Sequence, residues 1–117
     1  MYTKNQYCTL DDTIGLSEEL EGMTIKTLKP CDTIHVRTCN SEYEVFLLEP
    51  ESGLALVKGG EFFTEPMQAT VSGSTFGGSM LKSGWLCEGL QMELCAGGRR
   101  IVTSPVQELR IEHQSLT

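Results

Sequence analysis

The sequence predicts an all-β protein: a single small β-barrel of about six strands with a polar, partly helical N-terminal extension. From residue 32 onward, apolar and polar residues alternate with a period of two, which is typical of strands. Turns rich in glycine, proline and serine separate these stretches at short intervals. The chain of 117 residues has the length of one domain. Its strand region, of roughly 80 residues, fits an SH3-like, OB-like or split barrel better than a full immunoglobulin sandwich.

The first 30 residues are polar and irregular, and we expect them to form an extension outside the barrel. Candidate N-caps followed by an acidic stretch predict a short helical turn over residues 16–22. A solvated acidic lead-in is the simpler interpretation of the same stretch. The expected division of the chain is a polar extension over residues 1–30, a barrel domain over 31–112 and a flexible tail over 113–117.

Six stretches after the extension carry the alternating pattern. In the first, Ile34 and Val36 fall on one side of the expected strand, and His35 and Arg37 fall on the other. An Asn-Ser turn before the second stretch indicates a hairpin. The expected strands cover residues 32–39, 42–49, 54–57, 67–75, 85–94 and 99–112.

The pattern also predicts which side chains point inward. Residues 42–49 carry apolar side chains on both faces, so we expect both faces of this strand to be buried. In the fourth strand we expect Met67, Ala69 and Val71 to point inward. Pro105 lies inside the last strand and has no N–H to donate, so it predicts an edge position, a bulge or a corner.

Composition argues against several classes of function. The formal net charge is -7, whereas a general nucleic-acid binder needs a basic excess to neutralise phosphates. No apolar run is long enough to span a membrane as a helix. The N-terminus lacks the basic start and apolar run of a secretory signal. Five cysteines, an odd number, fit reduced thiols, and together these features predict a cytoplasmic protein.

The stretch GSTFGGSMLKSGW, residues 73–85, contains two fragments that resemble functional motifs. Ser79 and Lys82 match the S-x-x-K pattern of serine acylating enzymes, but the companion motifs and the helix they require are absent. The glycines resemble a phosphate-binding loop, but neither G-x-x-x-x-G-K-[ST] nor G-x-G-x-x-G is present. The stretch is therefore interpreted as a glycine-rich connection between two central strands.

The cysteines and histidines give little support to metal binding or catalysis. Cys31, His35 and Cys39 are spaced four apart, but on one strand the two cysteines would lie ~26 Å apart at ~3.3 Å per residue. We therefore expect no metal and no cofactor, and cysteines that are small buried hydrophobes. A thiol enzyme using Cys39 or Cys87, with His35 as its base, remains open without further support. We expect a protein that is not an enzyme.

The leading hypothesis is a non-catalytic binding or interaction module. Its expected contact surface is the loop over residues 73–84 with Phe76, Lys82 and Trp85, because aromatic side chains at a loop edge often anchor recognition. The expected partner is another protein or a second copy of the chain, which would give a homodimer.

The alternative hypothesis is a small sensor domain that binds an anionic ligand such as a nucleotide. Its binding site would require four cationic side chains to converge in the folded barrel: Arg37, Lys82, Arg99 and Arg100.

Overall fold

The computed structural model describes residues 22–76 and 81–113, and these ranges are almost entirely β-structure. The all-β prediction is confirmed. One short 3-10 helix, η2, interrupts the strands near the start. The elements are β1 (Gly22–Thr24), η2 (Ile25–Thr27), β2 (Thr33–Thr38), β3 (Glu42–Glu49), β4 (Leu54–Gly59), β5 (Phe63–Thr75), β6 (Leu81–Ser83), β7 (Trp85–Cys87), β8 (Gln91–Ala96) and β9 (Arg99–Glu112).

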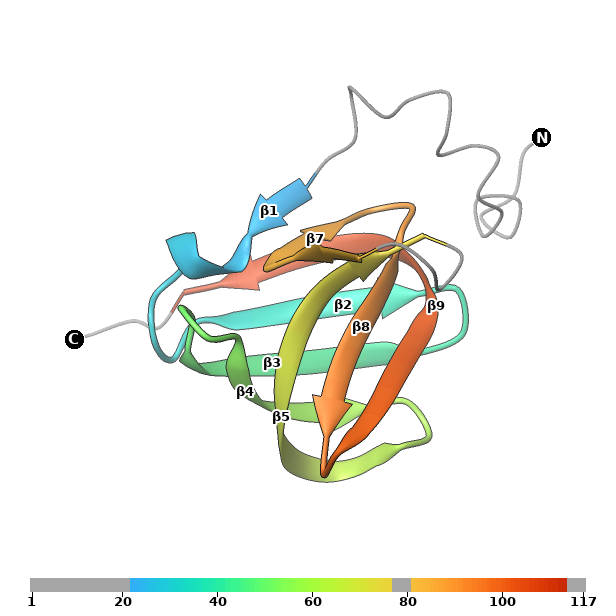
Figure 1. The fold of residues 1–117 in the computed structure, drawn as a ribbon, viewed down its shortest axis with the longest axis horizontal. Helices are drawn as coiled ribbons and strands as arrows, with labels where there is room; N and C mark the ends of the chain where they lie inside the picture. Colours follow the sequence, from blue (N-terminus) through green and yellow to red (C-terminus); the bar gives the residue numbers. More distant parts are fainter. Residues whose placement is uncertain (1–21, 77–80, 114–117) are drawn as a thin grey trace.

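A seven-stranded antiparallel sheet forms the body of the molecule, in the order β4-β3-β2-β9-β8-β5-β6. β4 pairs with β5 as well as with β3, and this additional pairing partly closes the sheet into a ring. A separate two-stranded sheet, β1–β7, lies along the upper side of the ring in Figure 1. Each pair of neighbours around the ring is antiparallel, so short turns suffice for most connections.

β9 changes its partner halfway along its length. Its first half, Arg99–Pro105, pairs with β8, and its second half, Val106–Glu112, pairs with β2. Both ladders have a register shift beside this point, and the Pro105 carbonyl accepts a hydrogen bond from the Cys39 N–H at 3.1 Å. Because proline cannot donate to a ladder, it fits where one partner replaces another. The prediction of a bulge or corner at Pro105 is confirmed.

The core fills the ring with the inward side chains of its strands. Their alternation follows the sequence: in β2, Ile34 and Val36 are buried, whereas His35 and Arg37 remain partly exposed. Burial of apolar area on this scale is the main favourable contribution to folding. The largest fully buried apolar side chains are Phe63, Ile25, Ile34, Leu47, Leu86, Met92 and Leu94.

Part of the expected N-terminal extension packs on the sheet. β1 pairs with β7, and Ile25 is only 1% exposed and belongs to the core. At the other end, His113 Nδ1 lies 3.1 Å from Oδ2 of the buried Asp32. The helical turn expected over residues 16–22 falls almost entirely outside the described residues. The division into extension, barrel domain and tail stays a prediction.

Three local expectations were wrong. The strand expected over residues 85–94 breaks into β7 and β8 at a turn, in which the Leu90 N–H donates to the Cys87 carbonyl at 3.2 Å. Only one face of β3 is fully buried, since Leu48 is 37% exposed. Met67 is 41% exposed rather than inward-facing in the core. In each case tertiary position overrides an apolar pattern.

Gly73, in β5, allows β6 to approach closely. Its φ is +141°, and a Cβ at this position would lie 2.1 Å from the Lys82 carbonyl oxygen. Gly97, in the β8–β9 turn, also has a positive φ, +59°, but no atom lies within 4 Å of its Cβ position. We predict that Gly73→Ala lowers the free energy of unfolding by ~3 kcal/mol or more, because strain and overlap add.

The matched control is Gly97→Ala, which should cost only about 1 kcal/mol for the left-handed backbone. Urea denaturation of the three proteins measures both effects. Equal losses for the two variants would contradict the close β5–β6 approach.

Candidate functional site

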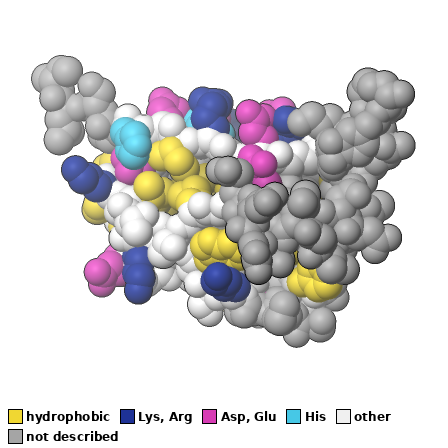
Figure 2. All heavy atoms as spheres, turned by 90° about the horizontal axis from the view of Figure 1, so that it is seen from above, with side chains coloured by type: hydrophobic (Ala, Val, Ile, Leu, Met, Phe, Trp, Pro, Cys, Tyr) yellow, Lys and Arg dark blue, Asp and Glu magenta, His cyan; other side chains and the backbone are white. Residues whose placement is uncertain are grey.

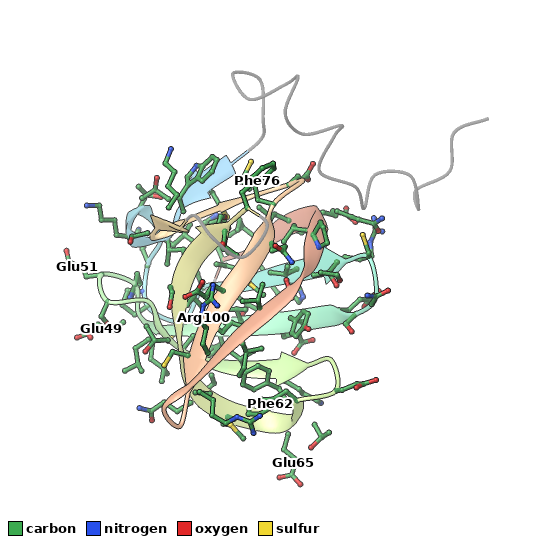
Figure 3. The ribbon with its side chains drawn as sticks, turned by 45° about the vertical axis from the view of Figure 1, so that its right-hand side comes forward. Glu49, Glu51, Phe62, Glu65, Phe76 and Arg100 are labelled. Carbon is green, nitrogen blue, oxygen red and sulfur yellow. The ribbon has the colours of Figure 1, made fainter. Side chains whose placement is uncertain are left out.

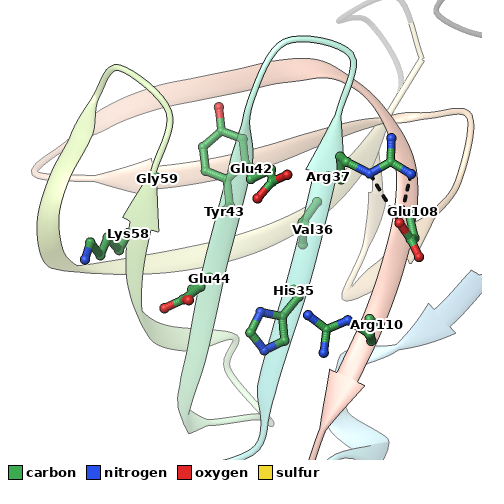
Figure 4. A pocket seen from close by; sticks show the side chains of 10 residues that line it. All are labelled: His35, Val36, Arg37, Glu42, Tyr43, Glu44, Lys58, Gly59, Glu108 and Arg110. Carbon is green, nitrogen blue, oxygen red and sulfur yellow. Dashed lines mark hydrogen bonds and ion pairs between the residues drawn. The ribbon is translucent and has the colours of Figure 1, made fainter. Parts of the chain in front are cut away.

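The outer face of the sheet carries a groove over β4, β3, β2 and β9. Its volume is about 270 Å³, and we call it the outer groove. Figure 4 shows that most of its side chains are charged and come from four neighbouring strands. The space of the groove lies between the charged side chains. It is open because the side chains of Val36 and Tyr43 point inward and Gly59 has none. The lining residues are His35, Val36, Arg37, Glu42, Tyr43, Glu44, Lys58, Gly59, Glu108 and Arg110.

Strand alternation and register bring these side chains together. In β2 and β3 the inward positions are mostly apolar, so the intervening residues point outward. His35 lies opposite Arg110 of β9 on one side and Glu44 of β3 on the other. Glu44 in turn lies opposite Lys58 of β4. One row of four titratable side chains therefore crosses three consecutive strands and β9, which is far from them in the sequence.

Two of the groove's basic side chains are held by β9. Arg37 donates from Nε at 3.2 Å and from Nη2 at 2.8 Å to Oε1 of Glu108, and from Nη1 at 2.8 Å to Gln107. His35 Nε2 lies 2.7 Å from Oε1 of Glu112. The guanidinium of Arg37 thus turns toward β9 and away from Glu42, which lies opposite it on β3. These contacts connect β2 to β9.

Four other charged side chains in the groove have no such partner. Glu42, Glu44, Lys58 and Arg110 make no side-chain hydrogen bond or ion pair within the part of the chain that the structure describes. Glu44 and Lys58 lie directly opposite one another, yet they form no ion pair. Their charges are therefore available to a ligand, and the groove offers both signs side by side.

Of the side chains expected to form the loop site, Lys82 and Trp85 are in contact. The Lys82 ammonium lies 4.1 Å from the centroid of the Trp85 ring, a cation–π contact. The indole also covers Gly22, where a Cβ would lie 2.5 Å from Nε1. Trp85 and Phe76 are both partly buried. Residues 77–80, the centre of the expected loop and the location of Ser79, lie outside the described residues.

The three arginines expected to share an anion do not converge. The Arg99 guanidinium lies 5.2 Å from the centroid of the Phe62 ring, and Arg100 pairs with Glu93 at 3.1 Å. Arg37 pairs with Glu108, eight residues farther along β9 than Arg100, a distance of ~26 Å along a strand. Figure 3 shows Arg100 well separated from Phe76. The described residues thus give the anion-sensor hypothesis no common site.

The nucleophiles and metal ligands give no catalytic arrangement. Both described histidines contact carboxylates rather than thiols. Cys87 is fully buried, and its Sγ lies 3.3 Å from the Glu88 carbonyl oxygen. Cys39 is disulfide-bonded, so the expectation of reduced, buried thiols was wrong there, and Cys31 and Cys95 are exposed. Across residues 22–76 and 81–113, no group of three His, Cys, Asp or Glu side chains could hold a metal ion.

Sequence reasoning missed the outer groove because its residues gather only through the register of β2, β3 and β4 and through the long-range pairing of β2 with β9. The polar positions of 32–39 and 42–49 were the available signal, but both faces of the second strand were expected to be buried.

A second cavity, of about 280 Å³, lies between η2, the β3–β4 turn and β5, and its side chains are mostly small and polar.

Comparison with known proteins yields no relative: no family model, no curated protein and no solved structure matches the chain. Within the described ranges, no helix has the length and apolarity needed to cross a membrane.

Tyr43, at the edge of the groove, provides a test of its geometry. Burial raises the pKa of its hydroxyl above the ordinary value of 10.0, and the nearby Glu61 carboxylate raises it further, against a hydrogen bond with Ser41 that lowers it. The folded state therefore keeps its proton after the unfolded state has lost it. We predict that this contribution to stability is present below pH 10 and is lost as the pH rises through the folded pKa.

Ultraviolet absorbance of tyrosinate during an alkaline titration measures this pKa. The chain has three tyrosines, and Tyr43→Phe should remove a step whose midpoint lies above pH 10. A step at or below pH 10 would contradict the burial of this hydroxyl.

Proposed function

We propose that the protein is a non-catalytic interaction module that binds other polypeptides through the outer groove. The observation that carries the proposal is the set of four charges, Glu42, Glu44, Lys58 and Arg110, that have no ion pair among the described residues. Polypeptide segments of mixed charge complement such a groove on both sides. A polyanion would meet the two carboxylates on β3, and like charges brought together oppose binding.

The fold supports this proposal by making the groove rigid. Because β2 and β3 are each paired on both sides, and the second half of β9 is paired with β2, the side chains stand on a fixed backbone, and less entropy is lost on binding. We further propose that the partly closed ring is a small barrel. Around it, consecutive strands are neighbours apart from the β6–β7 excursion, an order nearer to an up-and-down barrel than to the Greek-key order of an OB-fold.

The distribution of charge also favours a protein partner over nucleic acid. Figure 2 shows basic and acidic side chains interspersed on the face seen from above, rather than gathered in a basic patch. With a formal net charge of -7, the chain lacks the electrostatic excess that nonspecific nucleic-acid binding needs.

Two earlier hypotheses remain as alternatives. The loop site is less favoured than the groove because Lys82 and Trp85 already contact each other and Gly22. The anion sensor is less favoured because Arg37 and Arg100 are paired with carboxylates. The cytoplasmic location stays a prediction.

Peptides selected from a phage-displayed random library on the native protein test the proposal. We predict that the Glu42→Gln/Arg110→Gln double variant binds the selected peptides at least about tenfold more weakly, because each lost charge-assisted contact is worth ~1.5–3 kcal/mol. Titration calorimetry with synthetic peptides measures the affinities. Lys29→Gln/Glu51→Gln, which neutralises two exposed charges away from the groove, should leave them unchanged.

Selected peptides that bind both double variants as well as the native protein would reject the groove as the site. Failure to select any peptide would reject the module itself. Thermal stabilisation by a nucleotide that Arg100→Ala abolishes would instead support the anion sensor.

A further inference from the structure

The β3–β4 hairpin presents an outward surface with a charged end and an apolar end. We call it the hairpin face. In register, Glu44 lies opposite Lys58, and Phe46 lies opposite Leu56. Leu48 and Leu54 continue the apolar end toward the turn. The face therefore consists of Glu44, Phe46, Leu48, Leu54, Leu56 and Lys58.

The apolar end of the hairpin face does not pack on the core. Phe46, Leu54 and Leu56 are partly exposed and Leu48 is 37% exposed, and none of the four belongs to the core cluster or to the side chains packed against it. Four neighbouring large apolar side chains facing outward form a patch rather than scattered exposures. Contiguous patches of this kind mark interaction sites more often than isolated ones.

The hairpin face is complementary to itself. Consider a two-fold axis that is parallel to the strands and lies above the hairpin face, midway between β3 and β4. Rotation about this axis places β4 of a second copy over β3 of the first, and β3 of the second copy over β4 of the first. Glu44 then faces Lys58 of the second copy, and Phe46 faces Leu56 of the second copy. Each contact occurs twice, because such an interface uses the same surface on both sides.

We propose that the hairpin face docks on the same face of a second copy of this chain. The inference deepens the proposed function, on which it rests, by naming a partner for one side of the outer groove. Glu44 and Lys58, unpaired within the described chain, find opposite charges across the axis, and the apolar ends cover each other. Two-fold pairing satisfies both ends of the face at once.

The dimer is weak, because the face has far fewer residues than the roughly 20–30 per side of a standard interface. The net charge of -7 on each copy opposes association at long range. At physiological ionic strength this repulsion is largely screened beyond ~8 Å, whereas contacts at the interface persist. The dimer is therefore concentration-dependent.

Sedimentation equilibrium of the full chain tests the proposal by reversing charges. Glu44→Lys and Lys58→Glu each place like charges across the axis, twice per dimer, and should weaken self-association about tenfold or more. An equimolar mixture of the two variants restores opposite charges at both contacts and should form a heterodimer as strong as the native homodimer. The Glu44→Lys/Lys58→Glu double variant should self-associate like the native chain.

Lys82→Glu is the matched control for Lys58→Glu, since it makes the same change of net charge on an exposed residue of β6, at the opposite end of the sheet order from β4. It should dimerise as the native chain does. Unchanged far-ultraviolet circular dichroism and thermal unfolding establish that every variant is folded.

A native chain that is monomeric at every concentration would overturn the inference. Single variants that dimerise as the native chain does, or a mixture that stays monomeric, would overturn it as well. The proposed function fails separately, when no selected peptide depends on Glu42 and Arg110. Groove-dependent peptide binding by a strictly monomeric protein would thus retain the module and reject the self-docking.

Discussion

The pairing of β9 with two different strands is the constraint on which the rest of the structure depends. β9 leaves β8 and joins β2 at Pro105, and this exchange brings the last strand beside the first strand of the large sheet. β5 behaves similarly, since it pairs with β4 in its first half and with β8 in its second. Two long, bent strands thereby form the sides of the ring and enclose the apolar core.

Ring closure determines what the outer face can present. Because β2 is paired on both sides, its outward side chains lie between those of β3 and β9, in fixed register. Arg37 and His35 pair with carboxylates of β9 and support the closure. Exposed ion pairs contribute little individually, so the hydrophobic interior holds the ring and these pairs set the pattern of charge. The charged side chains of the outer groove that have no ion pair among the described residues lie on β3, β4 and the second half of β9.

The sequence predicted the strands well because alternation is a local signal. Five of the six expected stretches correspond to single strands, and even the irregularity at Pro105 followed from its missing N–H. The break within residues 85–94 was missed, because residues 88–90 form a turn inside an otherwise continuous pattern. Leu48 was misplaced because it lies near the end of β3, at a register shift, and Met67 because an apolar residue inside a strand can alternate correctly and still face solvent.

The candidate site was much harder to predict than the strands. Arg37 was predicted to bind an anion together with Arg99 and Arg100, but it binds the carboxylate of Glu108. This partner lies 71 residues away in the sequence. Glu44 and Lys58 were not singled out, because only the β3–β4 register places them opposite one another. Which charges are paired depends on rotamers and long-range register, and neither can be obtained from local periodicity.

The central claim is that the outer face of β3 and β4 docks on the same face of a second copy of the chain. Nuclear magnetic resonance spectra of the uniformly labelled native chain over a range of concentrations test it directly, because each amide reports on its own surroundings. The account predicts concentration-dependent shifts in β3 and β4, centred on Glu44, Phe46, Leu56 and Lys58. Shifts confined to the surroundings of Phe76 and Trp85, or no shifts at any concentration, would contradict it.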